Sequence, residues 1–161
     1  MEISPSLWSA LTAYGHYLGL MVSYLALGVE FFHLSPEISL KNAKRVAFAD
    51  IAYGIAVTLV LVTGVLRVIY FGKGTDYYLH NPFFHVKIGL FVLVGLLSLY
   101  PTFTFIFWFK DFQKEQAPSL DATQAQRLIV LVKLELFIFS LIPLWAALMA
   151  RLSSWGLLVS S

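Results

Sequence analysis

The sequence predicts an all-α integral membrane protein, a bundle of four membrane-spanning helices, and three observations support this prediction. Hydrophobic residues make up 59% of the 161 residues, and charged residues only 12%. Long apolar runs alternate with short polar loops, and about 20 apolar residues are enough for a helix to cross a bilayer. The segment 88–109 carries no charged residue at all. We therefore expect one membrane domain over residues 1–161, surrounded by lipid.

Local signals mark the expected spans. The first apolar run follows Ser-Pro-Ser, which is typical of a helix start, and its Gly15, Gly19 and Gly28 have the spacing that lets a second helix approach closely. The last run follows Ser-Leu-Asp-Ala-Thr-Gln, which also resembles a helix start. The spans are expected at residues 8–32, 46–70, 86–109 and 128–150.

Charge in the loops predicts the orientation. The first and third loops together hold six Lys or Arg residues, whereas the central hairpin loop holds only Lys73. Basic residues in short loops favour the cytoplasmic side, so both termini and the hairpin are expected on the non-cytoplasmic side. The acidic N-terminus does not resemble a signal peptide, which predicts a retained first helix. A bacterial inner membrane or a thylakoid membrane fits this topology.

Composition excludes several classes of function. The chain has no cysteine, which rules out disulfides, iron–sulfur clusters and thiolate ligands to a metal. The net charge is only +2 and the basic residues are dispersed, so no nucleic-acid partner is expected.

Basic and titratable side chains gather in the outer half of the predicted bundle. His16 lies about seven residues below the outer end of the first span, and Arg67, His85 and Lys87 lie near the hairpin. Arg151 ends the fourth span on the same side. No acidic residue accompanies them within the spans, so an anionic ligand is expected. In the alternative reading, Arg67 and Lys87 extend to lipid headgroups, His85 is interfacial, and His16 is a hydrogen-bonded core histidine.

Haem b matches the chemistry of this outer layer. It needs an axial ligand, commonly histidine, and an apolar slot, and its propionates need cations. In this hypothesis His16 ligates iron and His85 is the second ligand. Arg67 and Lys87 bind the carboxylates and carry the catalytic roles for an anionic tetrapyrrole substrate.

The inner half contains ionisable residues of both signs. They are Glu30, His33, Asp50, Lys133 and Glu135. Paired charges can satisfy one another inside a membrane, which predicts an ion-pair network that holds the inner end together. A proton relay is the alternative.

Over nearly its whole length, the chain resembles a family of small bacterial, especially cyanobacterial, membrane proteins of unknown function. More distantly it resembles the HemJ-type protoporphyrinogen oxidases, four-helix membrane enzymes that bind haem b. The points of contact are the early histidine at His16, the helix ending "TGVLRV", and "HVKIGL" at the start of the third span. The HemJ family usually has W-[LI]-H-x-K where this chain reads "NPFFHVK". The resemblance implies roles in haem binding and activity for His16 and Lys87, with His85 beside them.

The leading interpretation is therefore a membrane protein that binds haem b or a related tetrapyrrole, with protoporphyrinogen oxidase-like redox activity and a quinone as the electron acceptor. The alternative is a non-enzymatic membrane subunit or assembly factor without a cofactor, and a homo-oligomer fits either interpretation.

Overall fold

The structure, a computed structural model, describes residues 4–152, and these residues form helices and short connections with no strand. This confirms the all-α class, and the four long helices are long and apolar enough to cross a membrane. One turn of π-helix, η1, extends α2, and the short helix α3 lies within the segment expected to be a loop. The elements are α1 (Pro5–His33), α2 (Leu40–Leu66), η1 (Arg67–Phe71), α3 (Thr75–Leu79), α4 (Pro82–Phe112) and α5 (Ala122–Arg151).

Each expected span lies within α1, α4, α5 or the continuous segment formed by α2 and η1. These segments extend beyond the spans, because polar caps rather than the limits of the apolar runs set where the helices begin. The side chain of Ser39 accepts a hydrogen bond from the backbone N–H of Asn42 at the start of α2. Asn81 caps α4 in the same way, and the Asp121 carboxylate accepts a hydrogen bond of 2.7 Å from the backbone N–H of Gln124 at the start of α5. Such side chains satisfy amide groups that lack a partner within the helix. The helices therefore begin in polar sequence.

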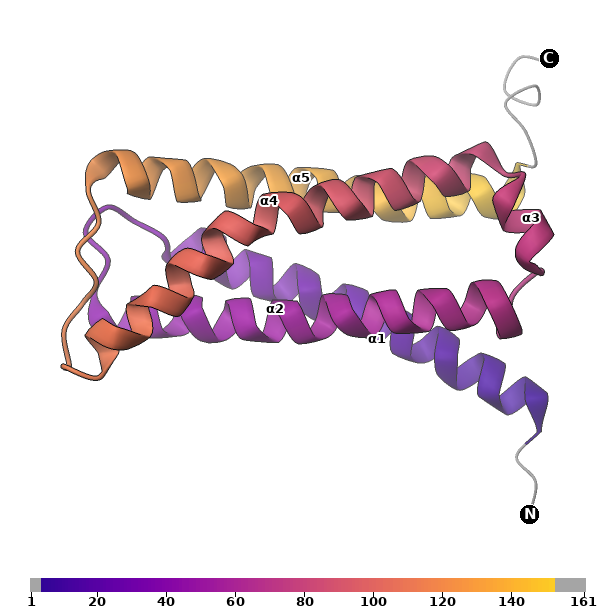
Figure 1. Ribbon diagram of the computed structural model, residues 1–161, viewed down its shortest axis with the longest axis horizontal. Coiled ribbons are helices and arrows are strands. Elements are labelled where there is room, and N and C mark those ends of the chain that lie inside the picture. Colours follow the sequence, from indigo (N-terminus) through magenta and orange to yellow (C-terminus); the bar gives the residue numbers. More distant parts are fainter. Residues whose placement is uncertain (1–3, 153–161) are drawn as a thin grey trace.

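The helices pack as two antiparallel pairs, α1 with α2 and α4 with α5, and α4 crosses from α5 towards the beginning of α2 (Figure 1). Both connections between paired helices lie at one end of the bundle, which we call the loop end. The hairpin end holds η1, α3, the start of α1 and the end of α5. In Figure 1, α1 ends before the loop-end limits of α2 and α5 are reached. The chain thus begins and ends its described helices at the same end.

The apolar interior divides into two clusters along the bundle. The loop-end core is formed by Leu34, Ile38, Ala43, Val46, Ala47, Phe105, Trp108, Leu128 and Val132. The hairpin-end core is formed by Ala26, Leu27, Tyr53, Val94, Phe139 and Ile142. The hairpin-end core draws residues from all four long helices. The loop-end core draws them from α2, α4, α5 and the connection between α1 and α2, so both cores hold the two pairs together. Four polar residues lie between residues of the two cores along the sequence: Glu30, Asp50, Thr102 and Glu135.

The close approach of α1 to α2 depends on Gly19. A Cβ at this position would lie 2.8 Å from Val60 Cγ2 and 3.0 Å from the Ala56 carbonyl oxygen. We expect Gly19→Ala to lower the free energy of unfolding by about 1–3 kcal/mol, because overpacking forces the helices apart. Denaturation of the purified protein in mixed micelles measures this loss.

Gly28 provides the matched control on the same helix, since a Cβ there would meet no atom within 4 Å. We expect Gly28→Ala to leave stability unchanged or slightly higher, because alanine favours the helix. Equal losses in the two variants would contradict tight packing at Gly19.

Candidate functional site

His16 of α1 is hydrogen-bonded to α2 through the Nδ1 atom of its imidazole ring. Its Nδ1 lies 3.1 Å from the Val60 carbonyl oxygen and 3.0 Å from Thr63 Oγ1. A carbonyl oxygen only accepts hydrogen bonds, so Nδ1 is the donor and carries the proton. The ring also packs against Gly64, where a Cβ would lie 3.4 Å from its Cε1 atom. In the neutral ring, Nε2 is therefore left unprotonated, and it has no hydrogen-bond partner within residues 4–152.

Arg67 and Lys87 lie near His16, and all three side chains interact electrostatically. The Arg67 guanidinium stacks over the Tyr17 ring at 5.6 Å from its centroid, and the Lys87 ammonium lies 5.6 Å from the centroid of the Phe84 ring. Neither cation makes an ion pair in the part of the chain that the structure describes. His16, Arg67 and Lys87 therefore form a partly buried basic cluster, with two positive charges that lack an anion.

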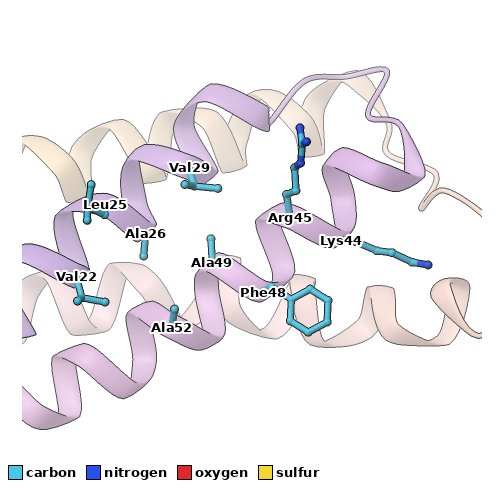
Figure 2. Close-up of a pocket in the computed structure, with 9 residues that line it drawn as sticks. All are labelled: Val22, Leu25, Ala26, Val29, Lys44, Arg45, Phe48, Ala49 and Ala52. Carbon is cyan, nitrogen blue, oxygen red and sulfur yellow. The ribbon is translucent and has the colours of Figure 1, made fainter.

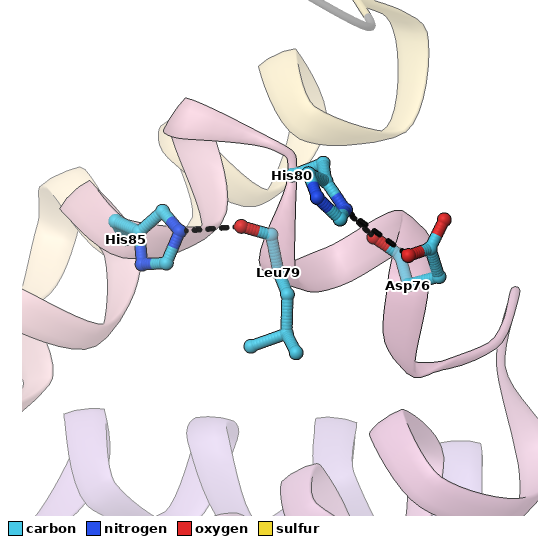
Figure 3. A network of polar contacts seen from close by, with 4 residues as sticks. All are labelled: Asp76, Leu79, His80 and His85. Carbon is cyan, nitrogen blue, oxygen red and sulfur yellow. Dashed lines mark hydrogen bonds and ion pairs between the residues drawn. The ribbon is translucent and has the colours of Figure 1, made fainter.

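His85 contacts the end of α3 (Figure 3). Its Nε2 donates to the Leu79 carbonyl oxygen at 2.8 Å, and its side chain is exposed. His85 and Lys87 are two residues apart on α4, which places them about 200° apart around the helix. The neighbouring His80 is paired with Asp76 at 3.2 Å in α3. The structure thus brings together three of the four expected site residues and leaves His85 outside.

The basic cluster contains the types of side chain that a haem site would use, with one histidine for an axial position. Histidines that bind metals usually donate their other ring N–H to a carbonyl or carboxylate oxygen, which fixes the ring. His16 does this through Nδ1 and Val60, and Nε2 is the nitrogen left for iron. Arg67 and Lys87 supply cations for carboxylates. His85 uses its Nε2 for Leu79, so the fit rests on His16 alone as axial ligand.

Three acidic side chains meet between the two apolar cores. Glu30 of α1, Asp50 of α2 and Glu135 of α5 all interact electrostatically with one another. Glu30 and Glu135 are each only 1% exposed, and one carboxyl oxygen of each is buried without a hydrogen-bond partner. Asp50 accepts a hydrogen bond from the Thr102 hydroxyl of α4 at 2.8 Å. We call these three residues the carboxyl cluster.

The expected ion-pair network at this end of the bundle is not formed, and that prediction is wrong. Lys133 lies over the Phe31 ring, 5.8 Å from its centroid. His33 donates from Nδ1 to the Val29 carbonyl oxygen, and its Nε2 contacts Arg45. On a helix, positions 133 and 135 lie about 200° apart, so Lys133 cannot share the face of Glu135. Among the described residues, no cation pairs with the carboxyl cluster.

Three residues of this polar layer, Tyr53, Ser98 and Thr102, were not identified from the sequence. Tyr53 is 3% exposed, its buried hydroxyl has no hydrogen-bond partner, and it interacts electrostatically with all three carboxyl groups. Ser98 of α4 lies near this hydroxyl. Tyr53 follows Asp50 by three residues, a spacing that places both on one helix face. Thr102 gave no signal, because the apolar run of α4 does not reveal which face points inward.

A shallow groove of about 490 Å³ runs between α1 and α2 on the outside of the bundle (Figure 2). Its walls are apolar along most of its length, and Lys44 and Arg45 lie near its loop end. None of the expected ligand histidines lines it. Its lining includes Val22, Ala26, Val29, Phe48, Ala49 and Ala52.

One family model matches the chain over residues 8–152, and its description is "Predicted membrane protein (DUF2214)". The match covers all four long helices and both polar clusters. No curated protein and no solved structure matches the chain.

Proposed function

Because the chain belongs to the DUF2214 family of predicted membrane proteins, we propose that it is an integral membrane protein that binds haem b or a related anionic tetrapyrrole at His16, Arg67 and Lys87. The observation that carries this proposal is the state of His16. Its Nδ1 is hydrogen-bonded to Val60 and Thr63, which leaves Nε2 without a hydrogen bond near the cations of Arg67 and Lys87.

Each residue of the basic cluster has a distinct role in this proposal. His16 provides the axial nitrogen, and the seat formed by Val60, Thr63 and Gly64 on α2 fixes the ring. Arg67 and Lys87 bind carboxylates of the tetrapyrrole, and the aromatic rings of Tyr17 and Phe84 lie beside their charged groups. A charge-assisted hydrogen bond of this kind contributes about 1.5–3 kcal/mol.

The proposed activity is a membrane oxidoreductase that acts on an anionic tetrapyrrole, with a quinone as the electron acceptor. Haem b, when bound, supplies a one-electron redox centre whose potential the protein tunes through the axial ligand and its hydrogen bonds. The His16–Val60 hydrogen bond is the one that would tune it here. Arg67 and Lys87 orient the substrate by its carboxylates.

The absorption spectrum of the detergent-purified protein, expressed with haem supplied, tests the binding proposal. We expect a Soret band in the wild type and its loss in His16→Ala. His85→Ala is the matched control and should keep the band, because His85 lies outside the cluster. Arg67→Ala and Lys87→Ala should each weaken haem binding about tenfold, since 1.4 kcal/mol corresponds to a factor of ten.

A wild type that shows no Soret band, or a band that persists in His16→Ala, would overturn the haem assignment. Absence of haem in the wild type would favour the alternative function, a membrane subunit or assembly factor without a cofactor. In that case Arg67 and Lys87 would contact lipid phosphates at the hairpin end.

The proposal also includes an orientation and a location. Six Lys and Arg residues lie in the loop-end connections and in the helix ends beside them, whereas the segment between η1 and α4 carries Lys73 alone, so we place the loop end in the cytoplasm. The basic cluster then opens towards the non-cytoplasmic side of a bacterial inner membrane or a thylakoid membrane.

A further inference from the structure

The carboxyl cluster has no role in the proposed haem site, yet together with the hydroxyl side chains beside it the cluster draws on all four long helices. Glu30 comes from α1, Asp50 and Tyr53 from α2, Thr102 and Ser98 from α4, and Glu135 from α5. Each of these helices must be correctly paired for the layer to exist. A purely structural interior would place apolar side chains here, as the two cores on either side do.

The electrostatics of the carboxyl cluster require a ligand. A buried ion without a partner costs several kcal/mol, and carboxylates that share a site do not ionise independently. The titratable groups that face the cluster are the three carboxyls and the Tyr53 hydroxyl, and no cation among the described residues pairs with them. Three negative charges therefore cannot persist here, and protons or cations must neutralise them.

The unpaired hydroxyl of Tyr53 is an independent sign of a ligand. The Tyr53 side chain is only 3% exposed, and its hydroxyl has no hydrogen-bond partner within 3.5 Å. Buried hydroxyls normally find a partner, because leaving one unsatisfied costs about 1–3 kcal/mol. Tyr53 thus places a hydroxyl with no close hydrogen bond near the carboxyls, with Ser98 in its vicinity, and one oxygen of Glu30 and one of Glu135 are likewise without a partner.

The described residues contain no group of three or more His, Asp or Glu side chains placed to hold a metal ion. The carboxyl oxygens share an electrostatic environment without converging on one coordination centre. A proton needs only one oxygen and can be shared by neighbouring groups, so the arrangement favours protons over a metal ion as the ligand.

The two apolar cores close this layer from both ends. The loop-end core contains Val46, Phe105 and Val132, which precede or follow the polar residues on their helices by a few positions. The hairpin-end core contains Leu27 and Phe139 on the other side. A proton that enters or leaves must therefore pass one core. Glu30 lies three residues before the last residue of α1, so the loop end is the nearer end of the bundle for this carboxyl group.

We propose that Glu30, Asp50 and Glu135, together with Tyr53 and Thr102, form an intramembrane proton-binding site that exchanges protons with the aqueous phase at the loop end. The carboxyl groups share the bound protons, Tyr53 donates to or accepts from whichever carboxyl oxygen is free, and Thr102 fixes Asp50. This inference does not depend on haem binding at the hairpin end.

Infrared spectroscopy of the purified full-length protein at neutral pH tests the site. Carboxyl groups in water are ionised at this pH, so a carbonyl band of protonated carboxylic acid reports buried, protonated groups. We expect this band in the wild type, a change in its intensity or position in Glu30→Gln, Asp50→Asn and Glu135→Gln, and its loss in the triple variant. In D₂O the wild-type band should shift to lower frequency.

Glu37→Gln is the control, because Glu37 is exposed in the connection between α1 and α2 and should leave the band unaltered. Circular dichroism shows whether each variant is folded, and the D₂O shift of the wild type tests the proposal even where a variant is not. The proposal is overturned by any of three results. These are absence of the band at neutral pH, its persistence in the folded triple variant, and a band that never shifts in D₂O.

Discussion

Replacing Phe139 with alanine is expected to lower the free energy of unfolding by about 3 kcal/mol, the lower end of the range for phenylalanine in soluble cores. Phe139 is fully buried in the hairpin-end core and packs edge-to-face on Tyr24, with ring centroids 5.0 Å apart. Lipid solvates apolar groups as well as the protein interior does, so little of the loss comes from transfer. Most of it comes from the cavity and from lost dispersion contacts.

Phe137 on the same helix is the matched control for this prediction. Its side chain is 63% exposed on the outside of the bundle, where lipid replaces the contacts that alanine removes. We expect Phe137→Ala to change the free energy of unfolding by less than about 0.5 kcal/mol. Denaturation in mixed micelles compares the two variants, and similar losses would mean that α5 does not present Phe139 to the core.

The second large effect is expected for Gly72→Ala, at the turn that follows η1. A Cβ on Gly72 would overlap with the Arg67 carbonyl oxygen and with the hydroxyl of Tyr78, which is buried. Because one of these atoms belongs to the backbone, the turn must open to relieve the overlap. We expect a loss of about 3 kcal/mol, at the upper end for overpacking.

This substitution also tests the link between the turn and the basic cluster, because the displaced carbonyl belongs to Arg67. If haem binds as proposed, Gly72→Ala should weaken its retention as well as stability, and haem titration measures this. The control is Gly95→Ala in α4, where a Cβ would meet nothing within 4 Å. Gly72→Ala and Gly95→Ala of equal stability would contradict the close packing of this turn.

Much of the fold could be predicted from local sequence. The low charge and the long apolar runs determine four spans, since a bilayer admits only segments whose backbone is satisfied internally. The basic layer at the hairpin end could also be predicted, because a position along a helix fixes depth. The starts of α2 and α5 depend on capping side chains, Ser39 and Asp121, which lie in the polar flanks outside the apolar runs.

The carboxyl cluster shows where sequence reasoning stopped. Glu30, Asp50 and Glu135 were recognised as costly residues at one end of the bundle, and the predicted partner was Lys133. The choice of partner depends on which face each helix turns inward. In the structure, Lys133 lies over the ring of Phe31, and Tyr53 and Thr102 lie beside the carboxyl groups instead.

The sequence by itself therefore determined the membrane environment, the number of spans and the position of each ionisable residue along its span, because these follow from hydropathy along the chain. Only the tertiary structure decided which residues face one another. In the structure, His16 is hydrogen-bonded to Val60 and Thr63 and lies near Arg67 and Lys87. His85 is hydrogen-bonded to Leu79 instead. The physical reason is that helices in lipid pair by close packing of their surfaces rather than by burial of an apolar face, so periodicity in the sequence does not reveal their rotation.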